Sequence, residues 1–173
     1  MVGRAPAKSC FEKAVDLLGR RAHFRRELEL KLQRRGYESG EIAETLARLQ
    51  ELKYLDDERT AGAFVEARAE RSPAGKPLLK SELVRRGVTR TLAEEATEGL
   101  DEAAAAKEAA DRFLRRRLRP KETKEERQQA LFRHLAGRGF QGSVIRQAMT
   151  TAFQEIELAE EAFEALESVT EDS

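Results

Sequence analysis

Three glycines divide the chain into three similar parts. Gly36, Gly87 and Gly139 are 51 and 52 residues apart, and an arginine precedes each of them. The residues that recur around these glycines are leucine eight before (Leu28, Leu79, Leu131), leucine four before (Leu32, Leu83, Leu135) and an apolar residue directly after (Tyr37, Val88, Phe140). An apolar stripe that ends in this way is typical of a helix closed by a left-handed glycine. We therefore predict three tandem repeats of about three helices each.

Helical periodicity extends over most of the chain, whereas the alternation typical of strands is absent. Ala, Leu, Glu and Arg, which favour helices, dominate, and 11 Gly and 4 Pro are few for a β protein. The sequence therefore predicts an all-α fold. No apolar run approaches a membrane span or a secretory signal, and the lone Cys10 excludes an internal disulfide. We expect a cytoplasmic protein that does not enter a membrane.

Capping residues predict where several helices begin. Ser9 with Glu12 and Thr123 with Glu126 have the spacing of a capping box. Asp56 is expected to cap a further helix, and Thr91 with Glu94 another.

These signals divide the chain into five segments. We expect a flexible N-terminus over residues 1–9 and repeats over residues 10–55, 56–100 and 101–154. Residues 155–173 are expected to form an acidic helical extension that ends in a disordered tail from Ser168. The last helix has an apolar seam with heptad-like spacing: Ile145, Met149, Ala152, Ile156, Ala159, Phe163 and Leu166. We expect its first part, to Ile156, to pack on the third repeat.

The charge is distributed unevenly although 32 basic and 32 acidic residues balance. Residues 1–90 have a net charge of +6, and residues 91–173 a net charge of −6. The segment from Glu155 contains eight acidic residues and no basic one. This segment either continues the last helix as a soluble extension or folds back over basic surface of the N-terminal half.

Four segments resemble the RecX family, the bacterial regulators of the RecA recombinase. The segments are Ala14-Val15-Asp16-Leu17-Leu18 to Gly36-Tyr37; Tyr54-Leu55-Asp56-Asp57-Glu58-Arg59 with Ala63-Phe64-Val65; Ser81 to Val88; and Leu135 to Met149. Together the resemblance covers roughly residues 10–153. It implies three three-helix repeats in an elongated, curved arrangement. It also implies binding, as a monomer, to RecA-type filaments on single-stranded DNA and inhibition of filament growth, strand exchange and RecA-stimulated proteolysis. No catalysis is attributed to the family.

The residues themselves give little support for catalysis or a metal site. His23 and His134 are far apart in sequence, and neither has a ligand partner at helical spacing. No glycine-rich phosphate loop is present. We expect no cofactor, no metal and a buried, unreactive Cys10.

Basic clusters are the stronger functional signal, because some recur at matched repeat positions. The candidate partner- or DNA-binding residues are Arg25, Arg26, Arg34, Arg35, Lys80, Arg85, Arg86, Arg115, Arg116 and Arg117. Stacked repeats would place Arg34, Arg35, Arg85 and Arg86 along one edge as a basic strip, suited to phosphates and carboxylates. The alternative is an ordinary solvated surface whose charges nearby acids neutralise.

Three functions remain open from the sequence. The resemblance favours a non-enzymatic regulator of recombinase filaments. Weak direct DNA binding is compatible with this function. The alternatives are a stand-alone DNA-binding helical module, for which affinity for bare DNA would suffice, and a helical scaffold with a protein-only partner. The zero net charge disfavours the DNA-binding module, because nonspecific affinity grows with the phosphates neutralised.

Overall fold

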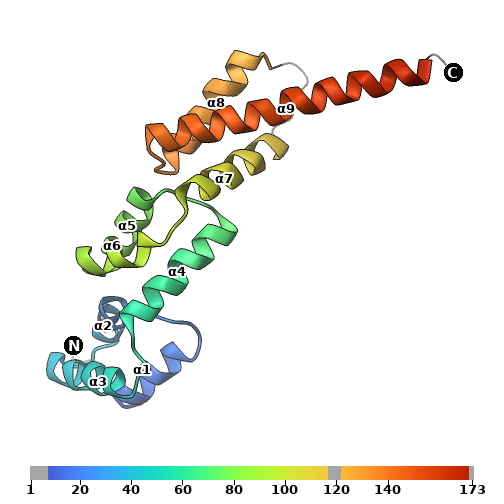
Figure 1. The fold of residues 1–173 in the computed structure, drawn as a ribbon. Coiled ribbons are helices and arrows are strands. Elements are labelled where there is room, and N and C mark those ends of the chain that lie inside the picture. The colour runs from blue at the N-terminus through green and yellow to red at the C-terminus, as the bar shows by residue number, and fades with distance from the viewer. Residues whose placement is uncertain (1–7, 117–121, 172–173) are drawn as a thin grey trace. The chain divides into compact units, whose positions relative to one another are not determined.

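The computed structural model describes residues 8–116 and 122–171 of the chain. Within them are nine α-helices and no strand (Figure 1). The helices are α1 (Cys10–Leu18), α2 (Arg25–Gln33), α3 (Ser39–Glu51), α4 (Asp57–Arg71), α5 (Lys76–Arg85), α6 (Arg90–Glu98), α7 (Glu102–Arg116), α8 (Lys124–Gly137) and α9 (Gly142–Glu171). The all-α prediction is confirmed. No helix in the described part is long and apolar enough to cross a membrane.

The predicted helix starts are confirmed with one exception. Both capping boxes form, at Ser9 before α1 and at Thr123 before α8. Asp56 Oδ1 accepts a hydrogen bond from the Arg59 amide at the start of α4. The prediction that Thr91 caps α6 is wrong, because the Thr89 side chain accepts the Leu92 amide and Thr91 lies within the helix. Val88 is buried directly before Thr89, so the helix begins two residues earlier than the capping pattern predicted.

The three repeat glycines end their helices as predicted. Their φ angles are 84°, 91° and 78° at Gly36, Gly87 and Gly139, in the left-handed region that glycine favours. The amide after each glycine reaches back to the carbonyl of the repeat leucine, at Leu32, Leu83 and Leu135. The apolar residues that follow the glycines are buried. Each repeat therefore closes its helix with a Schellman motif.

The molecule consists of two compact units that do not coincide with the repeats. The first unit comprises the described residues to Ala67 together with Leu79–Gly99, and the second comprises Arg68–Leu78 and the described residues from Leu100. In the first unit, α1, α2 and α3 enclose a core of Cys10, Ala14, Leu17, Leu28, Leu32, Tyr37, Ile42, Leu46, Leu49 and Leu55.

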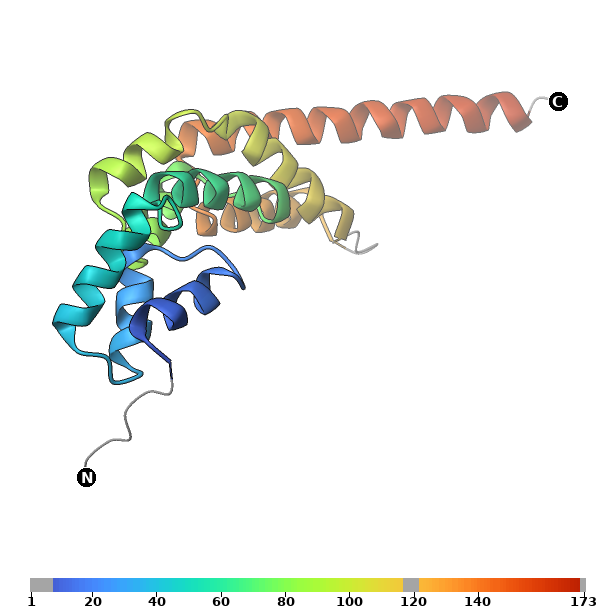
Figure 2. The same ribbon diagram turned by 90° about the horizontal axis from the view of Figure 1, so that it is seen from below.

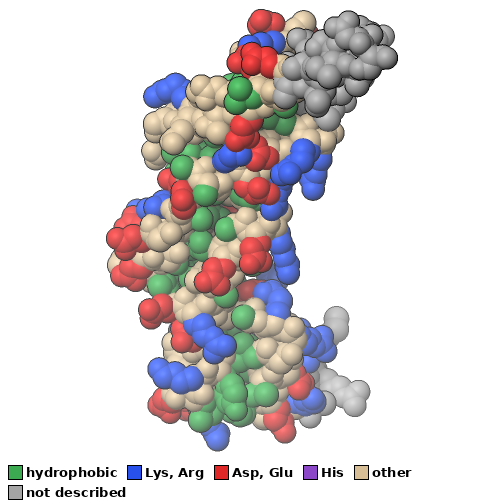
Figure 3. All heavy atoms as spheres, turned by 45° about the vertical axis from the view of Figure 1, so that its right-hand side comes forward, with side chains coloured by type: hydrophobic (Ala, Val, Ile, Leu, Met, Phe, Trp, Pro, Cys, Tyr) green, Lys and Arg blue, Asp and Glu red, His purple; other side chains and the backbone are tan. Residues whose placement is uncertain are grey.

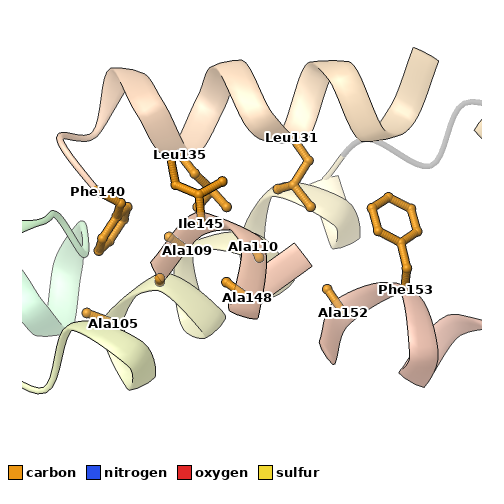
Figure 4. Close-up of a cluster of buried hydrophobic side chains, with 11 residues drawn as sticks. Ala105, Ala109, Ala110, Leu131, Leu135, Phe140, Ile145, Ala148, Ala152 and Phe153 are labelled. Atoms are coloured by element: carbon orange, nitrogen blue, oxygen red, sulfur yellow. The ribbon is translucent and has the colours of Figure 1, made fainter. Parts of the chain in front are cut away.

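The core of the second unit lies between α7, α8 and α9 (Figure 4). Leu131 and Leu135 of α8 point toward the alanines of α7, among them Ala109 and Ala110. On α9, Ile145, Ala148, Ala152 and Phe153 complete the cluster. The small side chains allow α7 and α9 to approach closely, so the alanine-rich sequence of α7 serves packing.

Helix α9 continues beyond the helices on which it packs (Figures 1 and 2). Ile156 is half-buried against the core of the second unit, as expected, whereas Leu158 is exposed. The side chains of Phe163 and Leu166 lie outside the described part. The helix extends to Glu171, into the segment for which the sequence predicts a disordered tail from Ser168.

Two acidic residues of the extension form ion pairs with lysines of α7 and α8. Glu155 Oε2 lies 3.0 Å from Lys107 Nζ, and Glu157 pairs with Lys124. These contacts hold the first turn of the extension against α7 and α8.

Candidate partner-binding surface

Arg34 and Arg35 are exposed at the end of α2. Arg34 forms the C-cap, and Arg35 Nη1 donates to the Lys31 carbonyl at 2.6 Å. Neither guanidinium has a carboxylate partner among the described residues. A cation at this helix end is favoured by the macrodipole and remains available to a partner.

Arg85 and Arg86 occupy the matching position at the end of α5 and are also exposed. The Arg86 guanidinium lies over the Phe64 ring, 4.9 Å from its centre. This cation–π contact orients Arg86 without neutralising its charge.

Within the first unit, Arg26 lies next to the end of α5, where Arg85 and Arg86 are located. A Cβ added to Gly87 would lie 2.3 Å from Arg26 Cβ, so the α5 terminus abuts the first turn of α2. Arg26 is partly neutralised by Glu29, at 3.0 Å. Arg25 is tied into the fold, because its amide donates to Asp57 Oδ1 at 2.7 Å and its Nη1 to Gln50 Oε1 at 3.2 Å.

The other predicted residues differ in their surroundings. Lys80 is half-buried, with its Nζ 4.0 Å from Glu94 Oε1. Arg115 and Arg116 are exposed at the end of α7. Arg117 lies outside the described residues. On the face in Figure 3, basic and acidic side chains are interspersed, so this face is not uniformly basic.

Four arginines of the second unit form another group, of which the sequence analysis predicted only Arg116 as a binding residue. Arg71, Arg112, Arg116 and Arg138 line one hollow of about 480 Å³. Arg138 stands directly before the third repeat glycine, as Arg35 and Arg86 stand before the first two, but its side chain points inward. The recurring arginine was the only signal available in the sequence, and it did not indicate this direction.

Contacts at both ends of its guanidinium hold Arg138 in place. Nε donates to His134 Nε2 at 2.9 Å, while Nη1 donates to Ser72 Oγ at 2.8 Å and to the Pro73 carbonyl at 2.9 Å. Burial lowers the pKa of Arg138, and the nearby positive charges of Arg68, Arg112 and Arg116 lower it further.

The remaining buried polar groups have structural roles. Burial raises the pKa of the Cys10 thiol, which agrees with an unreactive cysteine. His23 is buried with Nδ1 3.2 Å from Glu27 Oε1. Burial opposes ionisation of Glu27, but Arg21, His23 and Lys31 outweigh it and hold the pKa of Glu27 at about 2. Among the described residues, no group of three or more His, Cys, Asp or Glu side chains is arranged to hold a metal.

Family models match all three repeats. The first, second and third three-helix domains of RecX match residues 10–49, 56–96 and 101–149. The regulatory protein RecX of Chlorobium phaeobacteroides is 34% identical over 150 residues, which cover 85% of this chain and 95% of that protein. The RecX protein of Prosthecochloris aestuarii is 36% identical over 142 residues, covering 82% and 92%.

Solved structures share the fold. The crystal structure of RecX from Lactobacillus salivarius superposes with a TM-score of 0.70 at 22% identity, covering 86% of this chain and 95% of that one. A second crystal structure of a regulatory protein RecX gives a TM-score of 0.71 at 19% identity, covering 80% and 70%.

Proposed function

Because this chain belongs to the RecX family, we propose that it regulates a RecA-type recombinase by binding the filament that the recombinase forms on single-stranded DNA. In this proposal it acts as a non-enzymatic monomer in the cytoplasm. It limits filament growth, strand exchange and stimulated proteolysis. The observation that carries the proposal is the match of all three repeats to the RecX domains.

The proposed mechanism is occupancy of the filament. Exposed guanidiniums at the ends of α2 and α5, above all Arg34 and Arg85, contact DNA phosphates and recombinase carboxylates. Such charge-assisted hydrogen bonds are about twice as strong as neutral ones. A chain held in this way blocks the arrival of the next recombinase subunit or of a second DNA strand.

Charge reversal at Arg34, Arg35, Arg85 and Arg86 tests this mechanism. These side chains are exposed, so their replacement by Glu leaves the cores of the fold intact. We expect inhibition of recombinase ATPase and strand exchange to fall sharply, with the largest loss at low salt. Thermal unfolding should change only modestly.

A matched variant controls for net charge. Arg20, Lys53, Arg59 and Arg90 are also exposed cations of the first unit, and reversing all four changes the charge by the same amount. This variant should inhibit like the parent chain. If both variants inhibited normally, the four strip arginines would be no more than a solvated surface.

A further inference from the structure

The charged side chains that line the hollow in the second unit are all arginines. Arg71, Arg112, Arg116 and Arg138 face it, and none of the described residues that line it is acidic. Glu108 pairs with Arg112, whereas no acidic residue in the described part of the chain pairs with Arg71, Arg116 or Arg138, so these three positive charges repel each other across the hollow. An anion in the hollow would offset this repulsion.

Two of the four guanidiniums are fixed in advance. Besides the three bonds that hold Arg138, its Nη2 has no hydrogen bond to a described residue and remains available to a ligand. Arg112 Nε donates to Glu108 at 2.5 Å, and its Nη1 and Nη2 donate to the carbonyls of Arg71 and Glu70 at 3.0 and 2.8 Å. A ligand therefore meets donors whose conformational entropy has already been lost.

The other two arginines stand at the mouth of the hollow. Arg71 and Arg116 are exposed, and neither side chain has a hydrogen bond or ion pair within the described chain. They complete a set of planar donors suited to phosphate oxygens.

One wall of the hollow is aromatic. The rings of Phe113 and His134 lie 4.5 Å apart, tilted by 33°, and both side chains are half-buried. Burial and the neighbouring Arg138 lower the pKa of His134, whose Nε2 accepts a hydrogen bond and is therefore unprotonated. The two rings stack on each other and place neutral aromatic groups beside the cations. Nucleic-acid bases stack on aromatic side chains where cations bind their phosphates.

We propose that this hollow binds a nucleotide, with the phosphate held by Arg71, Arg112, Arg116 and Arg138 and the base placed against Phe113 and His134. The inference goes beyond the proposed function, because it concerns this chain alone and needs no recombinase. The phosphate can belong to a DNA strand or to a free nucleotide, which share this chemistry.

Replacing Arg71 and Arg116 together by Ala tests the site without endangering the fold. The matched control replaces Arg133 and Arg146, two exposed arginines of the second unit that do not line the hollow. Binding of a fluorescent oligothymidylate is followed by anisotropy across salt concentrations. Binding of dTMP and of inorganic phosphate is followed by NMR of the Arg112 and Arg138 Nε–Hε groups.

We expect the double variant to bind the oligonucleotide at least about tenfold more weakly, which corresponds to ~1.4 kcal/mol. Loss of two phosphate contacts should reduce the salt slope by about 1.4. The control should match the parent chain, and dTMP should shift both arginine signals. Tighter binding of the oligonucleotide than of dTMP assigns the site to a strand, and equal binding assigns it to free nucleotides.

Three results would overturn the proposal. The first is a double variant that binds like the parent chain, and the second is an equal loss in the control. The third is inorganic phosphate binding as tightly as dTMP, since the aromatic wall would then contribute nothing. Recombinase inhibition is measured separately, so either proposal can fail without the other.

Discussion

Arg35 in the first unit and Arg138 in the second stand at the same position before a repeat glycine but have opposite surroundings. Arg35 is exposed and contacts only its own helix, at the Lys31 carbonyl. Arg138 is half-buried and bridges His134 to the Ser72–Pro73 segment. The repeat pattern sets the backbone conformation at both positions, whereas neighbouring segments determine whether the arginine side chain is exposed or half-buried.

The glycines show the same contrast. A Cβ added to Gly36 would meet nothing within 4 Å, whereas one added to Gly139 would lie 2.6 Å from Leu78 Cβ and 3.0 Å from its amide nitrogen. Gly36 is needed for its backbone angle alone. Gly139 is needed for its angle and for close packing.

The largest effect is expected at this pair of glycines. Gly36→Ala should cost about 1–2 kcal/mol of unfolding free energy, because only the left-handed backbone is strained. Gly139→Ala adds an overlap with Leu78 that should cost a further ~1–3 kcal/mol. Urea denaturation of both variants measures the difference. Equal losses would mean that the second unit is not packed as described.

Replacement of the arginine in the second unit should likewise cost more unfolding free energy than replacement of the arginine in the first unit. Arg138→Ala removes the bonds to His134, Ser72 and Pro73 and leaves partly buried acceptors unpaired, at a cost of about 2–3 kcal/mol. Arg35→Ala should stay within about 0.5 kcal/mol, as is usual for exposed sites. Denaturant midpoints compare the two variants. A destabilising Arg35→Ala would contradict the contrast between them.

Charge compensation also distinguishes the units. Glu27 in the first unit is surrounded by Arg21, His23 and Lys31, and its pKa of about 2 lies below the ordinary 4.5. The stability it contributes is present above pH 4.5 and is lost as the pH falls toward 2. We expect a contribution of about 1–2 kcal/mol, reduced by partial solvent exposure.

Glu27→Gln should remove this contribution at neutral pH and flatten the stability profile between pH 5 and 2. Thermal unfolding across this range provides the measurement, with Glu44→Gln, an exposed residue of α3, as the control. Parallel profiles for the parent chain and Glu27→Gln would show that the cluster does not stabilise the first unit.

The smallest effect is expected at the acidic extension. Truncation after Gln154 removes the pairs of Glu155 with Lys107 and of Glu157 with Lys124, together with the half-buried Ile156. Exposed ion pairs contribute little, so the melting temperature should fall only slightly. Filament binding should be unchanged. Tighter binding by the truncated chain at low salt would instead support a fold-back of the extension.

Sequence patterns of a few residues predicted how individual helices begin and end. The left-handed angles at Gly36, Gly87 and Gly139 and the capping boxes at Ser9 and Thr123 all follow from residues close in sequence. The error at Thr91 arose because two threonines two residues apart compete for one helix start, and the burial of Val88 decided between them.

The arginine-lined hollow could not be predicted in this way. Arg71 and Arg138 both line it although they are 67 residues apart in the sequence, and no helical or repeat spacing predicts that they lie close together. The repeat places Arg34 and Arg85 at matching helix ends, but whether an acidic residue of the described chain lies beside them depends on the packed neighbours.

The central claim is that the assembled filament is the target of this chain. The most direct test compares its binding to bare single-stranded DNA, to recombinase without DNA and to the filament, at one salt concentration. The account predicts that the filament is bound much more tightly than either component alone. Binding to bare DNA that equals binding to the filament would contradict it and identify a stand-alone DNA-binding module.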